Sequence, residues 1–309
     1  MARLMLNRER SISTLFRSTT VKTSTKMLLA AAGFLVSSAA SAANMYMNLT
    51  SNTYDVNGGS YLDSDTKTGV FNEFGFNQLL ATSVYDMSDG SIFGNFYDTN
   101  DPALLGPAGV PTSGLSLDGS KTVSLVMPSC PTGQCDIDGL SPLVPPMSSD
   151  NEGFLNSWDL QVLYKFDGNL SSSGPSFTGG YIEMYFNDLL NDANDRLVMK
   201  AKVTGSTINL GNLDIFFEID SVEEGFLWVQ GKDGSYYDAS KRYTTLHLDT
   251  NVNPPVPTPD QLLLVGSNAI RQTTLDGSVT AELPEPASIA LVGLGLLGLG
   301  SLSRRRMRR

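Results

Sequence analysis

The chain has 309 residues, of which 41% are hydrophobic and 17% are charged, and its formal net charge at pH 7 is −11. Its two ends are basic and together contribute +9, so residues 44–283 carry −20. A segment this acidic repels a phosphate backbone, which argues against sequence-independent binding of nucleic acid. The single histidine, His247, excludes zinc sites that need several imidazoles.

The first predicted element is a secretory signal peptide. Basic residues precede a run of fourteen uncharged residues, Met27–Ala40, and residues 40–42 (Ala-Ser-Ala) fit the small-residue cleavage pattern. A buried core helix is the alternative interpretation of the same apolar run. We expect residues 1–43 to be removed and the mature chain to lie outside the cytoplasm. The predicted cleavage region comprises Ala42, Ala43 and Asn44.

Residues 44–283 are predicted to form an exported, acidic, β-rich domain. Apolar and more polar residues alternate over residues 160–166 and 213–219, which is typical of half-buried strands. Shorter β-rich runs follow, separated by turn sequences rich in Gly, Asn and Asp. The pattern predicts a mainly β body, either an antiparallel β-sandwich or a jelly-roll-like fold. The best candidates for short helices are residues 74–82 and 186–190.

Three irregular segments interrupt the strand pattern. Residues 101–119 and 127–150 are rich in Pro, Gly and Ser, which indicates long surface loops or a linker. A domain boundary near residue 150 is one interpretation, because the density of strand signals is higher after it. Residues 253–259 contain four prolines and are expected to be extended, with polyproline character.

Two cysteines, Cys130 and Cys135, enclose four residues. In an exported protein such a pair is expected to form a disulfide. The closed loop is short, so the bond stabilises the fold by only about 2 kcal/mol. A redox pair or half of a metal site are the alternatives. Redox motifs place two residues between their cysteines, however, and the chain has no second cysteine pair to complete a zinc site.

Carboxylate and amide side chains gather at residues 98–101, 136–139 and 191–195, all predicted to be loops. Asp249, Asn251 and Asn253 also have the alternate spacing of a calcium loop, but Pro254 stands where an EF-hand needs glycine. Solvated turns are the default interpretation, because Asp and Asn favour turns. Calcium is the only cofactor considered, with Asp192, Asn194, Asp249 and Asn251 as candidate ligands.

No catalytic residue is predicted. His247 alternates with two leucines and is expected to face solvent from a strand. Two of the three residues Glu183, Glu223 and Glu224 could supply a glycosidase pair, which needs two carboxyl groups facing across a cleft. Adjacent glutamates on a strand point to opposite faces, so Glu223 and Glu224 do not form that pair in a regular strand. Four aromatic residues are candidates for stacking on sugar rings or for the core: Trp158, Trp228, Tyr236 and Tyr237.

The last predicted element is a tripartite tail. Pro284-Glu285-Pro286 is followed by sixteen uncharged residues, 287–302, and then by an arginine cluster that includes Arg304, Arg305 and Arg306. Sixteen helical residues extend about 24 Å, somewhat less than a hydrocarbon core of about 30 Å. Arginine side chains can extend to the interface, so a strained single span of the inner membrane is feasible. The positive-inside rule keeps these arginines cytoplasmic.

This tail resembles the PEP-CTERM sorting signal of Gram-negative bacteria. The matching parts are the triplet at residues 284–286, the short apolar helix and the terminal arginines. The resemblance implies recognition in the inner membrane by an exosortase, which cuts near the triplet and releases the body to the cell surface or extracellular matrix. Such a tail would act like the hydrophobic tail of a GPI signal, which anchors the protein temporarily and is then removed. A permanent tail anchor is the alternative.

Within the body, residues 70–86, 177–197 and 247–279 resemble the flocculation-associated PEP-CTERM group. This resemblance implies a structural or adhesive protein that acts with extracellular polysaccharide in floc or biofilm formation, without catalysis. Two other classes are open: a carbohydrate-binding module and a glycan-active enzyme. The absence of a nucleophile motif and the single histidine favour binding over catalysis, but the residues do not separate a matrix protein from a carbohydrate-binding module.

Overall fold

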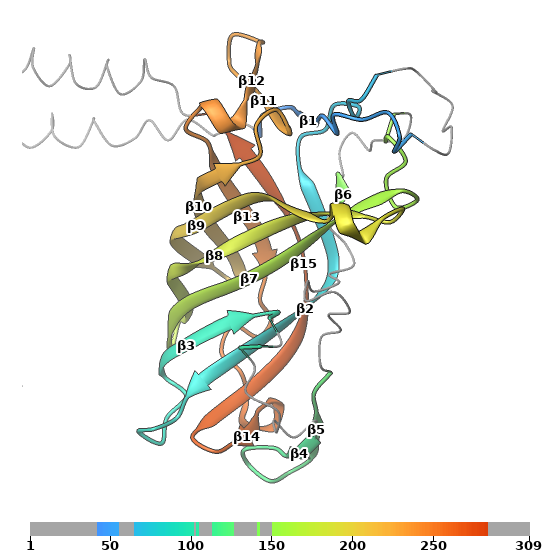
Figure 1. The fold of residues 1–309 in the computed structure, drawn as a ribbon. Helices are drawn as coiled ribbons and strands as arrows, with labels where there is room; N and C mark the ends of the chain where they lie inside the picture. The colour runs from blue at the N-terminus through green and yellow to red at the C-terminus, as the bar shows by residue number, and fades with distance from the viewer. Residues whose placement is uncertain are drawn as a thin grey trace, which may run out of the picture. The chain divides into compact units, whose positions relative to one another are not determined.

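The dominant element of the fold is one antiparallel sheet that closes on itself (Figure 1). The computed structural model describes residues 42–55, 65–101, 103–104, 113–126, 141–142 and 150–283. Eight strands make the closed sheet: β2 (Phe74–Asp86), β3 (Gly94–Thr99), β7 (Trp158–Ser171), β8 (Gly174–Asp188), β9 (Arg196–Asn209), β10 (Asn212–Val222), β13 (Thr245–Asn251) and β15 (Asn268–Glu282).

The spatial order of these strands is β15, β13, β10, β9, β8, β7, β3 and β2. Strand β2 then pairs with β15, from Asp86 opposite Asn268 to Phe74 opposite Val279, and this pairing closes the sheet. Two short strands extend it, β6 (Ser141–Pro142) beside β2 and β14 (Leu263–Val265) beside β15. The two strands of the closed sheet that precede residue 150, β2 and β3, are neighbours and lie between β7 and β15, so strands from both sides of residue 150 share this one sheet.

The prediction of a mainly β, antiparallel body is confirmed, whereas the sandwich or jelly-roll arrangement is wrong. A residue alternation of period two fixes which face of a strand is buried. It does not say whether that face packs on a second sheet or on the far wall of the same sheet. The short helix predicted over residues 74–82 is also wrong, because these residues belong to β2, and Phe186 belongs to β8.

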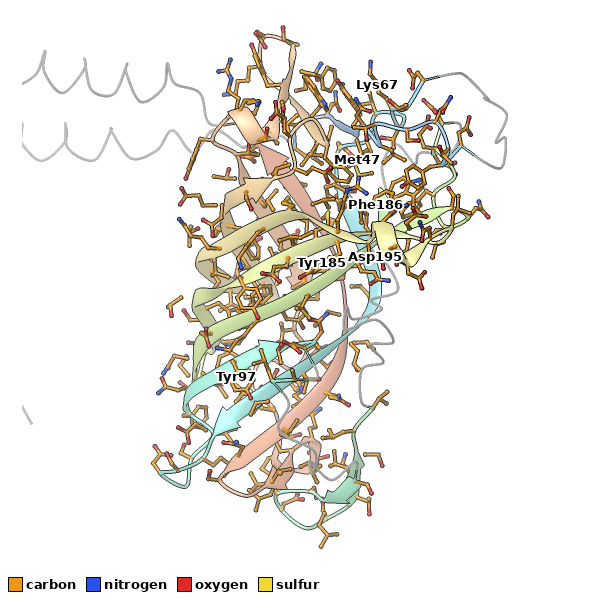
Figure 2. The ribbon with its side chains drawn as sticks, viewed as in Figure 1. Met47, Lys67, Tyr97, Tyr185, Phe186 and Asp195 are labelled. Carbon is orange, nitrogen blue, oxygen red and sulfur yellow. The ribbon has the colours of Figure 1, made fainter. Side chains whose placement is uncertain are left out.

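Alternate side chains of the strands fill the interior of the closed sheet. In β7 these are Trp158, Leu160, Val162, Tyr164 and Phe166, each at most 6% exposed. They join one large core cluster that also contains Met47 and Phe186 (Figure 2). Aromatic rings stack within it, with 5.4 Å between the ring centroids of Trp158 and Phe186. Burial of this apolar surface is the main stabilising contribution to the fold.

Smaller elements cover the closed sheet. A three-stranded sheet is made by β1 (Met45–Met47), β11 (Leu227–Gln230) and β12 (Tyr236–Asp238). A hairpin is formed by β4 (Ser113–Leu115) and β5 (Thr122–Ser124). Three short 3-10 helices are η1 (Asp192–Asn194), η2 (Ala239–Lys241) and η3 (Pro259–Gln261). Among the described residues no helix is long and apolar enough to span a membrane, and the span predicted at residues 287–302 lies outside those residues.

The side chain of Asn100, which directly follows β3, forms the hydrogen bonds to β7 that the backbone of a further strand residue would form. Its Nδ2 donates a hydrogen bond of 2.7 Å to the carbonyl of Val162, and its Oδ1 accepts one of 2.8 Å from the backbone N–H of Tyr164. The side chain is 3% exposed. It therefore continues the ladder with β7 by one more pair of bonds and satisfies two buried backbone groups.

We predict that Asn100→Ala destabilises the protein by about 2–4 kcal/mol, because it leaves a backbone donor and a backbone acceptor buried and unpaired. Urea unfolding of the full chain measures the change. Asn95→Ala, at an exposed position of β3, is the matched control and should change stability by less than about 0.5 kcal/mol. Equal losses in the two variants would show that the Asn100 side chain is not a structural part of the ladder.

Candidate functional site

The predicted cleavage region and the start of the sorting tail lie side by side. The backbone N–H of Ala43 donates a hydrogen bond of 3.2 Å to the carbonyl of Ala281, near the end of β15. Two hydrogen bonds of 2.8 Å join Asn44 to Gln230. The backbone N–H of Gln230 donates to the carbonyl of Asn44, and the Asn44 side-chain amide donates to Oε1 of Gln230. Since Ala281 lies three residues before Pro284, the chain enters and leaves the folded body at one place.

The remaining predicted tail and disulfide residues lie outside the described residues. These are Pro284, Glu285, Pro286, Arg304, Arg305, Arg306, Cys130 and Cys135. The structure therefore adds nothing to the predicted disulfide or to the predicted apolar helix, and both stay predictions.

The four candidate calcium ligands fall into two separate places. Asp192 and Asn194 form η1, just before β9 begins, and Asn194 donates a 2.7 Å hydrogen bond to Asp188. Asp249 and Asn251 belong to β13, near the other end of β9, where Asn251 lies opposite Asn212. The structure does not bring the two pairs together. Among the described residues no three His, Cys, Asp or Glu side chains are grouped as a metal site.

His247 and the three glutamates occupy the outer surface. The His247 Nε2 lies 2.8 Å from an Asp214 oxygen, and its ring stacks on Phe216. Glu183 pairs with Lys200, and two further ion pairs join Glu223 to Arg196 and Glu224 to Lys241. Each glutamate is thus engaged with a surface cation on its own part of the wall.

An aromatic face, defined as Tyr46, Trp228 and Tyr236, lies on the three-stranded sheet. Met45, Met47 and Val229 point into the core, so alternation places Tyr46 and Trp228 on the opposite side, where both are half-buried. The Tyr46 and Trp228 rings are stacked, 5.8 Å apart and within 5° of parallel, and Tyr236 lies 5.0 Å from Tyr46.

Polar groups border the aromatic face. Asn44 and Gln230 present their bonded amides at one edge. Burial raises the pKa of Tyr46, helped by the nearby Tyr236, and burial also raises the pKa of Tyr236, so both hydroxyls stay protonated at neutral pH. A surface of this kind offers apolar ring faces beside hydrogen-bonding groups.

The other two predicted aromatic residues have different roles. Trp158 is fully buried in the core. Tyr237 donates a hydrogen bond of 2.6 Å to Asp233, and the Arg242 guanidinium lies 4.2 Å from its ring centroid. Sequence reasoning missed Tyr46, although the alternation Met-Tyr-Met at residues 45–47 was a signal that it faces outward.

A cavity of about 60 Å³ lies inside the closed sheet. Six aromatic rings and several aliphatic side chains line it. The aromatic lining residues are Phe76, Tyr85, Phe96, Tyr164, Phe166 and Phe177, and the polar ones are Ser83, Asp98, Thr250, Arg271 and Thr273. The prediction that residues 98–101 form a loop is wrong for Asp98 and Thr99, which belong to β3, and Asp98 lines the cavity together with Phe96.

Asp98 is the acidic group of this cavity. The hydroxyls of Ser83 and Tyr164 each donate a 3.3 Å hydrogen bond to its carboxylate. Asp98 is half-buried and lines the cavity. Burial raises the pKa of Asp98 from 3.8 to about 6, against the smaller lowering effects of these hydroxyls and of Arg271. An ionised carboxylate is therefore costly at this position.

Residues 282–309 match the family model of the PEP-CTERM protein-sorting motif. The prediction made from the tail is confirmed: the chain carries a PEP-CTERM sorting motif at its C-terminal end. The motif implies export through the envelope of a Gram-negative bacterium and an exosortase as processing partner. No curated protein and no solved structure has significant similarity to the chain. The match begins at Glu282, the last residue of β15, so it covers the tail and not the folded body.

We predict that Asp98→Asn stabilises the protein at pH 7.5 but not at pH 3.5. An aspartate whose folded-state pKa is raised favours folding when protonated, so the wild type loses stability as pH rises from about 4 through about 6. The shift corresponds to a difference on the order of 3 kcal/mol.

Urea unfolding of the full chain at the two pH values measures this difference. Asp220→Asn is the control, because Asp220 lies on the outer surface, with 39% of its side chain exposed, near Lys202. The control should show no comparable gain at pH 7.5. A loss of stability in Asp98→Asn that is equal at both pH values would contradict the assignment of a buried, costly carboxylate.

Proposed function

We propose that this PEP-CTERM protein is a cell-surface or extracellular-matrix component that contributes to floc or biofilm formation by adhesive binding of extracellular polysaccharide, after an exosortase removes its tail. The observation that supports this most directly is the position of the motif. It begins where β15 ends, at the same place as the predicted signal cleavage, so removal of both terminal segments leaves the closed sheet intact.

The aromatic face supports adhesion to a glycan. A sugar ring has an apolar face of C–H groups, which packs against aromatic rings, and hydroxyls at its rim, which amides such as those of Asn44 and Gln230 can bond. Two of the three rings already lie nearly parallel, so little side-chain ordering is needed on binding. The same face fits the alternative function, a carbohydrate-binding module without a role in assembly.

The negative charge of the body limits which polysaccharides it is expected to bind. Residues 44–283 carry −20, so the body repels strongly acidic polysaccharide and favours neutral or amino-sugar polymers. Binding without catalysis is part of the proposal. It is supported by the surface ion pairs of Glu183, Glu223 and Glu224, which leave these carboxylates engaged on the outer wall. No cofactor is assigned.

We predict that the mature protein lacks both terminal segments. Mass spectrometry of the protein from producing cells should place its N-terminus among residues 42–44 and its C-terminus near residues 284–286. In cells without the exosortase, the arginine-rich tail should remain and the N-terminus should be unchanged. Loss of the tail in the absence of that enzyme would contradict exosortase processing, and retention of the tail in both strains would indicate a permanent anchor.

We predict that Tyr46→Ala and Trp228→Ala each weaken binding to polysaccharide isolated from the producing culture by about five- to tenfold. The reason is the loss of one ring of a stacked pair, which corresponds to about 1–1.5 kcal/mol. Sedimentation with the polymer measures the affinity. Tyr243→Ala is the matched control, because Tyr243 is a tyrosine with 58% exposure outside the aromatic face.

If both variants bind the polysaccharide with the affinity of the wild type, the aromatic face is not the binding surface. Cells provide the second readout: a strain without the gene, and one with the Tyr46→Ala/Trp228→Ala protein, should both disperse while polymer is still made. Aggregation that persists in the deletion strain would contradict the matrix role. If the deletion strain disperses but the strain with the Tyr46→Ala/Trp228→Ala protein still aggregates, another surface of the protein has the matrix role.

A further inference from the structure

The cavity lies toward one end of the closed sheet. Phe76 and Val279 extend its lining toward the other end, but most of the lining comes from the last part of β2 and β13, the first part of β8 and β10, and the middle of β3, β7 and β15. This is the end at which β7 turns into β8 and at which β14 and the hairpin β4–β5 lie (Figure 1). The aromatic face lies near Ala281 and shares no residue with the cavity lining, so the cavity is a second feature.

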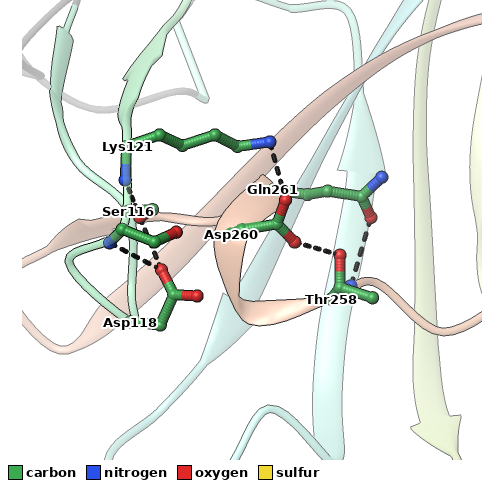
Figure 3. Close-up of polar contacts among 7 residues, drawn as sticks. Ser116, Asp118, Lys121, Thr258, Asp260 and Gln261 are labelled. Atoms are coloured by element: carbon green, nitrogen blue, oxygen red, sulfur yellow. Dashed lines mark hydrogen bonds and ion pairs between the residues drawn. The ribbon is translucent and has the colours of Figure 1, made fainter.

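A proline-containing segment, residues 252–262, borders the cavity at this end. Val252 and Pro255 line it directly. Arg271, which is 5% exposed, donates hydrogen bonds of 3.0 Å and 3.3 Å to the carbonyls of Pro254 and Asn253. These two bonds hold the segment, and the guanidinium keeps its positive charge beside the cavity that it lines. Farther along, Asp260 pairs with Lys121 at 2.7 Å, and Thr258 bonds to Gln261, so the hairpin β4–β5 holds its other end (Figure 3).

Asp98 has donors but no cation in contact. Its two hydroxyl partners lie at 3.3 Å, which is long for an O–H donor to a carboxylate. The Arg271 guanidinium lines the same cavity, and its charge lowers the pKa of Asp98, but it forms no ion pair with Asp98 within 4.0 Å among the described residues. The carboxylate thus retains capacity for a further donor on the cavity side. Aromatic rings surround it, with Tyr85 stacked on Phe96 at 5.4 Å and Tyr164 4.6 Å from Phe166.

These features fit a cationic ligand. A carboxylate set among aromatic rings attracts an ammonium group by both charge and the negative ring faces. The strongly acidic body also concentrates cations and repels carboxylate ligands. The small volume restricts the apolar part of the ligand to a short chain, since one water molecule occupies about 30 Å³ in the liquid.

We propose that the interior cavity is a binding site for a small primary amine with a short apolar body, whose ammonium group is held by Asp98 among the surrounding rings. The amine displaces cavity water, and its alkyl chain packs against Val162, Ile182 and Leu248. The site is independent of the adhesive function, because it uses none of the residues of the aromatic face.

The test is an NMR titration of the full chain in lipid nanodiscs, followed through the methyl groups of Val162, Ile182 and Leu248. Three probes of equal chain length separate charge from shape: n-propylammonium, 1-propanol and propionate. At pH 7.5 we expect n-propylammonium to bind with a Kd of about 1 mM. The alcohol should bind at least tenfold more weakly, and propionate should produce no saturable shift.

Variants locate the site. Asp98→Asn should weaken n-propylammonium binding at least tenfold while leaving 1-propanol within threefold. Glu224→Gln, which removes one charge from a side chain that is 75% exposed, should change neither. Val162→Phe should abolish binding of every probe by filling the cavity, with thermal unfolding showing that it is folded. Equal affinity for amine and alcohol, an unchanged amine affinity in Asp98→Asn, or no saturable shift with any probe would overturn the proposal.

Discussion

The pairing of β2 with β15 is the constraint on which the rest of the structure depends. These strands are separated by most of the body, yet they pair over almost their whole length. The pairing joins the first and last strands of the sheet and closes it, although β3 is short and pairs only with residues 82–85 of β2 and residues 165–170 of β7. It also creates an enclosed interior, which a pair of packed sheets of the same sequence pattern would not have.

The same pairing determines where the chain ends lie. Because β15 is the last strand and runs toward Ala43, the sorting motif begins beside the predicted signal cleavage region. A body with this arrangement needs no terminal segment for its sheet, since β15 ends at Glu282, where the motif match begins. The predicted removal of the two terminal segments would therefore leave every strand of the closed sheet in place.

Much of this fold could be read from the sequence, and the reason for the rest is specific. The alternation over residues 160–166 and 213–219 correctly located parts of β7 and β10, and the tail identified the sorting motif. The alternation of apolar and polar residues does not indicate whether a sheet closes, because the partner of each strand is determined by long-range contacts. Residues 74–82 were misassigned for a related reason: their run of apolar residues fits a helix until its pairing with β15 is known.

The candidate site was harder to predict than the strands. Trp228 and Tyr236 were identified as aromatic candidates, but Tyr46 lies far away in sequence and joins them only through the pairing of β1 with β11. Asp98 was placed in a loop, because Asp and Asn at residues 98–101 resemble a turn. In the structure Asn100 acts as a side-chain substitute for a strand residue, and this keeps β3 regular as far as Asp98.

The position of Asp98 is an argument about function as well as stability. A core selected for packing alone would place an apolar residue beside Phe96 and Tyr164, because an ionised carboxylate there opposes folding at neutral pH. The charge of Arg271 offsets only a small part of this cost, and its donors hold the carbonyls of Asn253 and Pro254. Polar groups that lower stability inside a well-packed interior are characteristic of binding sites. The two ends of the closed sheet thus differ in chemistry, with sugar-compatible rings on the outside at one end and a charged, enclosed space at the other.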